Sequence, residues 1–183
     1  MKKTILTVAL FSLAVIGNTQ AQNTTVGGEA MMPSMNIVEN AVNSEDHTTL
    51  VAAVKAGDLV EALQGEGPLT VFAPVNDAFE NLPEGTVETL LKEENKEALQ
   101  GVLTYHVVAG KYDFDAIQKL IKKNGGSAEL KTLSGGTLKA TMNGSHNIMV
   151  EDENGGSANI SVYDVYQSNG VIHVVDSVLL PKM

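Results

Sequence analysis

Two stretches of the chain, Thr70-Val-Phe-Ala-Pro-Val-Asn-Asp-Ala-Phe79 and Asn169-Gly-Val-Ile-His-Val-Val-Asp-Ser-Val-Leu-Leu-Pro181, decide the fold. Each contains a short apolar run rich in β-branched residues, which is typical of a strand buried on both faces. Polar residues and a proline close each run and predict a turn there. Between the two stretches, residues 95–106 repeat apolar side chains at helical spacing and end in the pair Tyr105-His106.

The period of the apolar residues changes along the chain. Helical spacing predicts helices within residues 36–65, 76–82, 86–91, 95–106 and 113–123. A period of two predicts strands at residues 129–133, 137–142, 147–150, 158–165 and 170–175, separated by Gly-rich and Asn-Gly turns. Helices come first and strands later, without alternating β-α-β units. This order favours an α+β domain with a mostly antiparallel sheet system.

The two stretches and the Tyr-His pair, in this order, resemble the fasciclin-type (FAS1) domain. The family motifs are similar to TVFAPTNDAF and GVIHVIDxVLLP, and Val75 replaces the threonine that is frequent in the first. The resemblance covers residues 36–183. It implies a wedge-shaped β-sandwich flanked by several helices. It also implies a secreted or surface-attached adhesion protein without enzymatic activity.

The first 35 residues predict export. Lys2 and Lys3 precede an apolar run and a small-residue site ending at Ala21, so residues 1–21 read as a signal peptide. Residues 22–35 show no periodicity and are predicted to be a flexible linker before the domain at 36–183. We therefore expect the mature protein in the periplasm, on the cell surface or outside the cell.

The charge of the chain restricts its partners. The sequence has 12 lysines, no arginine and 22 acidic residues, so its net charge is −10; removal of the two lysines in residues 1–21 leaves −12. Nucleic acid is not an expected partner, because phosphate binding requires a positive patch. The chain has no cysteine, so disulfides cannot stabilise it. No later segment is apolar enough over about 18 residues to predict a transmembrane helix.

Asn76 and Asp77 follow the first predicted strand directly. Either side chain can accept a backbone N–H and cap the short helix that follows, which contributes about 1 kcal/mol. The alternative is a pair of ligand groups in a cleft. The local strand-to-helix pattern favours the cap.

Tyr105 and His106 match the Tyr-His pair of the resembled family, which implies a partner-binding role. The residues themselves favour a different interpretation. His106 shares an apolar stripe with Leu99, Val102 and Leu103, so we expect a core histidine whose ring nitrogens are hydrogen-bonded. Both interpretations remain open at the level of sequence.

His173 and Asp176 lie in the second stretch, and we expect them to form hydrogen bonds with residues of the first stretch that hold strand to turn. Together with His106 and Asp77 they could instead supply zinc ligands, but no His-x-x-x-His or His-Glu-x-x-His spacing is present. Residues 152–156 carry oxygen ligands suitable for calcium, yet Asn-Gly-Gly between two strands predicts a hairpin turn. We expect no metal and no cofactor.

Three functions are consistent with these observations. The preferred one is a non-enzymatic adhesion or binding module that recognises a protein or polysaccharide of the cell surface or matrix. The second is a periplasmic protein for a small apolar or cationic ligand, which requires a deep apolar pocket with convergent polar groups. The third is a metal-dependent hydrolase built on the His/Asp set. No nucleophile elbow, phosphate-binding loop or dinucleotide fingerprint supports an enzyme.

Overall fold

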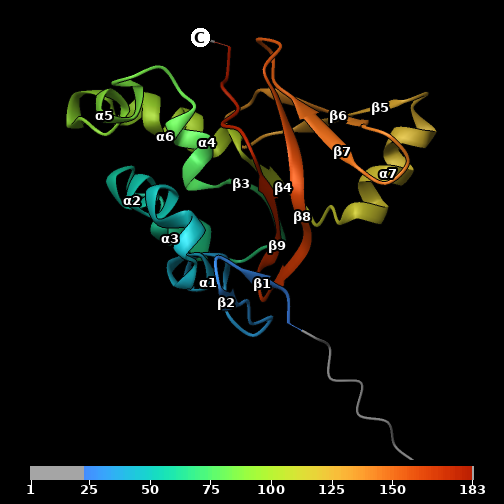
Figure 1. The fold of residues 1–183 in the computed structure, drawn as a ribbon, viewed down its shortest axis with the longest axis horizontal. Helices are drawn as coiled ribbons and strands as arrows, with labels where there is room; N and C mark the ends of the chain where they lie inside the picture. Colours follow the sequence, from blue (N-terminus) through green and yellow to red (C-terminus); the bar gives the residue numbers. More distant parts are fainter. Residues whose placement is uncertain (1–22, 183) are drawn as a thin grey trace, which may run out of the picture.

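The two motif strands lie side by side and run parallel. The computed structural model describes residues 23–182, and in it β3 (Leu69–Pro74) pairs with β9 (Gly170–Val175) so that Phe72 faces His173 in register (Figure 1). Every residue of β9 is buried, as are five of the six in β3. Burial on both faces explains why the two sequences are almost continuously apolar rather than alternating.

The remaining strands complete one seven-stranded sheet in the order β4-β3-β9-β8-β7-β6-β5. All neighbouring strands in it are antiparallel except the parallel pair β3 and β9. They are β4 (Val107–Ala109), β5 (Ser127–Lys131), β6 (Thr137–Met142), β7 (Ile148–Glu151) and β8 (Ser157–Gln167). Register shifts in the long strand β8 mark bulges, which bend it between the two halves of the sheet. A bridge between Val108 and Thr132 joins the two ends, so the sheet nearly closes.

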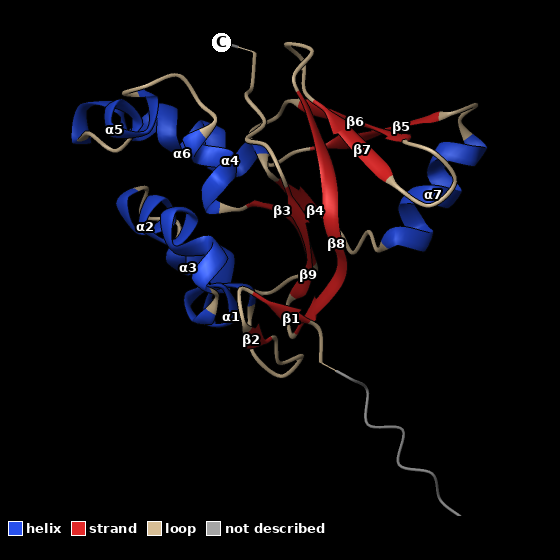
Figure 2. Cartoon of the chain, viewed as in Figure 1, coloured by secondary structure: helices blue, strands red, loops and turns tan. Residues whose placement is uncertain are grey.

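Among residues 23–182, seven α-helices flank this sheet. They are α1 (Ile37–Asn43), α2 (Thr48–Ala56), α3 (Val60–Gln64), α4 (Asn76–Glu80), α5 (Thr86–Leu90), α6 (Lys96–Tyr105) and α7 (Phe114–Lys123), with single 3-10 turns at Glu45–His47 and Glu93–Asn95. Helices α1 to α6 lie on one side, and α7 lies apart from them beside β5 to β7 (Figure 2). The α+β prediction, with strands flanked by helices, is confirmed.

Two clusters of buried apolar side chains fill the interior. One lies between α7 and the half-sheet β5 to β8 and includes Phe72, Tyr105, Ile117 and Leu138. The other lies between the helical layer and the β3–β9 region and includes residues such as Ile37 and Leu103. β3 contributes to both clusters because alternate side chains of a strand point to opposite faces.

The segment predicted to be a flexible linker is partly structured. Thr25–Val26 (β1) and Glu29–Ala30 (β2) form a small antiparallel hairpin, and Val26 and Met31 are buried against the helical layer. The prediction of a flexible linker over 22–35 is therefore wrong for this part. Strands of two residues are too short to show a period of two. The predicted signal peptide lies outside the described residues.

Candidate functional site

Tyr105 is the last residue of α6, and its side chain is completely buried. Its hydroxyl donates to the carbonyl of Thr137 at 2.9 Å and accepts from the N–H of Glu153 at 3.1 Å. Burial raises the pKa of the phenol, so the ring stays neutral and can donate. Tyr105 thus ties α6 to the start of β6 and to the β7–β8 turn, and presents no surface to a partner.

His106 follows at the C-terminus of α6 and is also buried. Nδ1 lies 2.8 Å from the carbonyl oxygen of Val102, and Nε2 accepts the N–H of Leu179 at 3.0 Å. This pairing requires a neutral ring with its proton on Nδ1. Burial lowers the pKa of His106 to about 4, so the ring stays neutral at neutral pH. The structure therefore places the Tyr-His pair in the core and leaves neither ring available for the partner contact that the family resemblance implied.

His173 is fully buried on β9. Its Nε2 lies 2.7 Å from the carbonyl oxygen of Tyr112, and its ring packs against Phe72 with 5.7 Å between centroids. Burial lowers the pKa of His173, so the neutral ring donates through Nε2. The expected link from strand to neighbouring segment exists, but it reaches the loop before α7 rather than the turn of the first motif.

Asn76 does not cap the helix that it begins. The N-cap of α4 is Val75, without a side-chain hydrogen bond. Asn76 Oδ1 instead accepts the N–H of Thr49 at 3.0 Å, and Nδ2 donates to the carbonyl of Glu45 at 2.8 Å. It therefore caps α2, whose own N-cap residue contributes no side-chain hydrogen bond. The predicted capping chemistry is present but serves a different helix.

The two acidic residues of the motifs differ in role. Asp77 is exposed in the first turn of α4, and its side chain makes no hydrogen bond to another described residue. Asp176 accepts the backbone N–H of Asn159 at 2.8 Å and its side-chain amide at 3.0 Å, which holds the end of β9 to β8. Within residues 23–182, no group of three His, Asp or Glu side chains could hold a metal ion.

Asp152 is a structural residue that the sequence interpretation missed. Its Oδ1 accepts the N–H groups of Asn154 and Gly156, and its Oδ2 accepts the N–H of Leu180 at 2.9 Å. The predicted hairpin turn is present, and a carboxylate holds it together. With His106, Asp152 fixes the C-terminal segment. The Asp-x-Asn-Gly-Gly pattern could have identified the turn contacts, but not the distant one.

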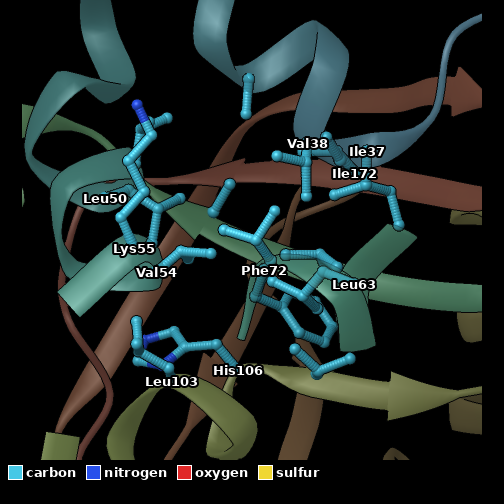
Figure 3. Close-up of a pocket in the computed structure, with 16 residues that line it drawn as sticks. Ile37, Val38, Leu50, Val54, Lys55, Leu63, Phe72, Leu103, His106 and Ile172 are labelled. Atoms are coloured by element: carbon cyan, nitrogen blue, oxygen red, sulfur yellow. The ribbon is translucent and has the colours of Figure 1, made fainter. Parts of the chain in front are cut away.

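An apolar cavity lies between the helical layer and the sheet (Figure 3). Its volume is about 40 Å³, and its walls are aliphatic and aromatic apart from His106, whose ring nitrogens are both hydrogen-bonded, and Lys55. Pockets for small organic ligands have volumes of about 300–1,000 Å³ and several convergent polar groups. The cavity has neither, so it does not meet the requirement of the small-ligand hypothesis.

The half-sheet β5 to β8 has one buried face and one polar face. α7 packs on its buried face, where Ile117 and Ile121 meet Leu130 and Leu138. The opposite face carries polar side chains in cross-strand neighbours, including an ion pair between Lys139 and Glu151 at 3.3 Å. Other residues of this face are Glu129, Lys131, Thr141, Asn159 and Ser161.

Comparisons with known proteins agree with this architecture. The model of the fasciclin domain matches residues 45–181. The protein sll1483 of Synechocystis is 47% identical over 165 residues, which cover 90% of this chain and 84% of that protein. Human periostin is 32% identical over 79% of this chain, which spans 16% of periostin. The immunogenic protein MPB70 of Mycobacterium bovis is 32% identical over 77% of this chain and 66% of its own length.

A solved structure shares the fold. A FAS1 domain pair from the insect cell adhesion molecule fasciclin I superposes with a TM-score of 0.70 at 18% identity, covering 80% of this chain and 51% of that one. Within the described residues, no helix has the length and apolar character to cross a membrane. The match of the family model over most of the chain, together with the shared fold, shows that the chain belongs to the fasciclin domain family.

Proposed function

We propose that this protein is an exported, non-enzymatic adhesion or binding module that recognises a protein or polysaccharide of the cell surface or matrix through its outer surface. One observation carries the proposal. Tyr105, His106 and His173, the residues of the motifs with the richest chemistry, are buried and hydrogen-bonded within the fold. Recognition is therefore left to the exterior.

The exposed face of the half-sheet β5 to β8 supports this proposal. Glu129 lies opposite Lys139, and Lys139 lies opposite Glu151, so opposite charges alternate across the strands. Exposed ion pairs contribute little to stability, about 0–1 kcal/mol. A rigid face with both signs of charge instead suits electrostatic complementarity to a partner, which governs specificity and association rate.

Retention on the organism's own envelope tests the proposal. Purified mature protein is passed over immobilised envelope fragments and over matrix polymers, and the retained fraction is measured at low and moderate salt. We expect retention that falls at least severalfold in the double variant Lys131→Glu with Lys139→Glu, since exposed charges act through a screened field. Digesting the envelope with protease beforehand separates a protein partner from a polysaccharide.

Tyr105→Phe is the matched control. It removes a buried hydroxyl and leaves every exposed side chain in place, so its retention should equal that of the parent. A parent protein that is retained no better than a charge-scrambled surface variant would overturn the proposal.

A further inference from the structure

A polar groove lies beside the turn that joins β8 to β9. That turn is at one end of the molecule (Figure 1). It has a volume of about 550 Å³, which falls in the range of about 300–1,000 Å³ seen for small-ligand sites. Its walls are the turn at 64–68, the turn at 167–170 and the side chain of Lys111. Asn169 and Gly170, the first two residues of the second motif, line it, whereas Tyr105, His106 and His173 do not.

The two turns that form the walls are held rigidly together by Asn169. Its side-chain amide donates to the carbonyls of Leu63 and Gly65 at 2.8 and 3.0 Å, and its Oδ1 accepts the N–H of Ile37 at 3.0 Å. Its backbone carbonyl accepts the N–H of Leu69. A site whose walls are already fixed loses little conformational entropy when a ligand binds.

Two glycines allow the turns to approach this closely. A Cβ at Gly67 would lie 1.9 Å from the carbonyl oxygen of Asn169, and a Cβ at Gly170 would lie 2.1 Å from that of Leu69. Any side chain at either position would push the walls apart. The groove therefore depends on the sequence at both turns.

The side chains that line the groove have unused hydrogen-bonding capacity. Gln64, Glu66, Lys111 and Ser168 are exposed and make no side-chain hydrogen bond to another described residue. Lys111 Nζ lies 4.4 Å from the centroid of the Tyr166 ring, a cation–π contact that holds it at the rim. The set offers an amide, a carboxylate, an ammonium and a hydroxyl, which together supply donors and acceptors in similar number.

We propose that this groove binds a neutral oligosaccharide segment of a matrix polysaccharide; this rests on the proposed function and specifies its polysaccharide partner. Sugar hydroxyls both donate and accept, so they match the mixed set in the groove. The charges of Lys111 and Glu66 cancel locally, and the chain carries a net charge of −10. Acidic polysaccharides are therefore repelled rather than attracted.

A titration followed by amide NMR tests the groove directly. The probes are neutral hexasaccharides of glucose, galactose and mannose and, as the anionic comparison, a hexamer of galacturonic acid. We expect at least one neutral probe to shift the amide signals of residues 64–68 and 167–170, with a dissociation constant on the order of 1 mM, since the site is open and wet. The anionic probe should bind more weakly.

Variants separate the groove from other surfaces. Gln64→Ala combined with Ser168→Ala should weaken binding of the neutral probe about tenfold or more, whereas Glu84→Ala combined with Thr89→Ala, in a separate hollow at α5, should leave it unchanged. All four residues are exposed, and equal melting temperatures of the variants and the parent verify the fold. The inference is overturned if no neutral probe shifts these amide signals, or if the Gln64→Ala/Ser168→Ala variant binds the probe as tightly as the parent does.

The envelope experiment distinguishes this failure from failure of the proposed function. If the parent protein is retained on envelope but no neutral probe binds the groove, only the groove assignment is wrong. If envelope retention is also absent, the proposed function fails with it. Retention that disappears after protease treatment identifies a protein partner and likewise rejects the oligosaccharide.

Discussion

The imidazole of His106 accepts a hydrogen bond at Nε2 from the backbone N–H of Leu179, 73 positions further along the chain. The same ring is bonded through Nδ1 to the carbonyl of Val102, one turn back in α6. His106 therefore joins the end of α6 to the C-terminal segment of the second motif. This contact explains the presence of a histidine on an otherwise apolar helix stripe without a partner or a metal.

The substitution His106→Ala should reduce the free energy of unfolding by about 3 kcal/mol. It removes a buried ring and leaves the N–H of Leu179 and the carbonyl of Val102 without partners in the core. Urea unfolding measures the loss. His146 is exposed in the β6–β7 turn, so His146→Ala should change stability by less than about 0.5 kcal/mol. Equal losses in the two variants would contradict the structural role.

Stability should fall as the pH is lowered from about 6.5 toward 4. Burial lowers the pKa of His106 to about 4, and it also lowers the pKa values of His47 and His173. The unfolded chain binds protons at these histidines below about pH 6.5, while the folded chain does not. The stability that the neutral histidines contribute to the folded state is therefore fully present above pH 6.5, and it is lost as the pH falls through their folded-state pKa values.

For His106 alone the loss amounts to about 3 kcal/mol once the pH is below both pKa values. Urea midpoints at pH 7.5 and 5.0 test this, since ordinary carboxylates titrate mainly below about pH 5. Identical midpoints at the two pH values would show that the buried rings do not stay neutral.

Asn76→Ala should cost about 1–2 kcal/mol, because it removes the acceptor for the N–H of Thr49 and the donor to Glu45. Asn76→Asp should cost less, since it keeps the acceptor and places a negative charge at the N-terminus of α2. Asp77→Ala, one position along and exposed, should cost only a few tenths to 1 kcal/mol. Thermal melts of the three variants would rank them. A larger loss for Asp77→Ala would show that α4, not α2, needs the cap.

How far the sequence predicts this structure depends on whether a contact is local. The strands 137–142 and 170–175 have the predicted bounds, because apolar period and flanking turns define them within a few residues. The parallel pairing of Phe72 with His173 was not predicted, since periodicity identifies a buried strand without identifying its neighbour. Asn76 shows the same limit: the local pattern identifies a capping side chain, whereas the helix that receives it is brought there by tertiary packing.

The N-terminal hairpin gives the last test, because the sequence favoured a flexible segment there and the structure buries two of its side chains. Val26→Ala should reduce the free energy of unfolding by about 1–2 kcal/mol, since the side chain packs in the cluster beneath the helical layer. Thr25→Ala alters the exposed neighbour on the same two-residue strand and should be nearly neutral. Urea midpoints of the two variants, and of a chain that begins at Asn36, decide whether this segment is flexible or packs on the domain and stabilises it. A chain beginning at Asn36 that is as stable as the parent chain would show that the hairpin contributes nothing to the domain.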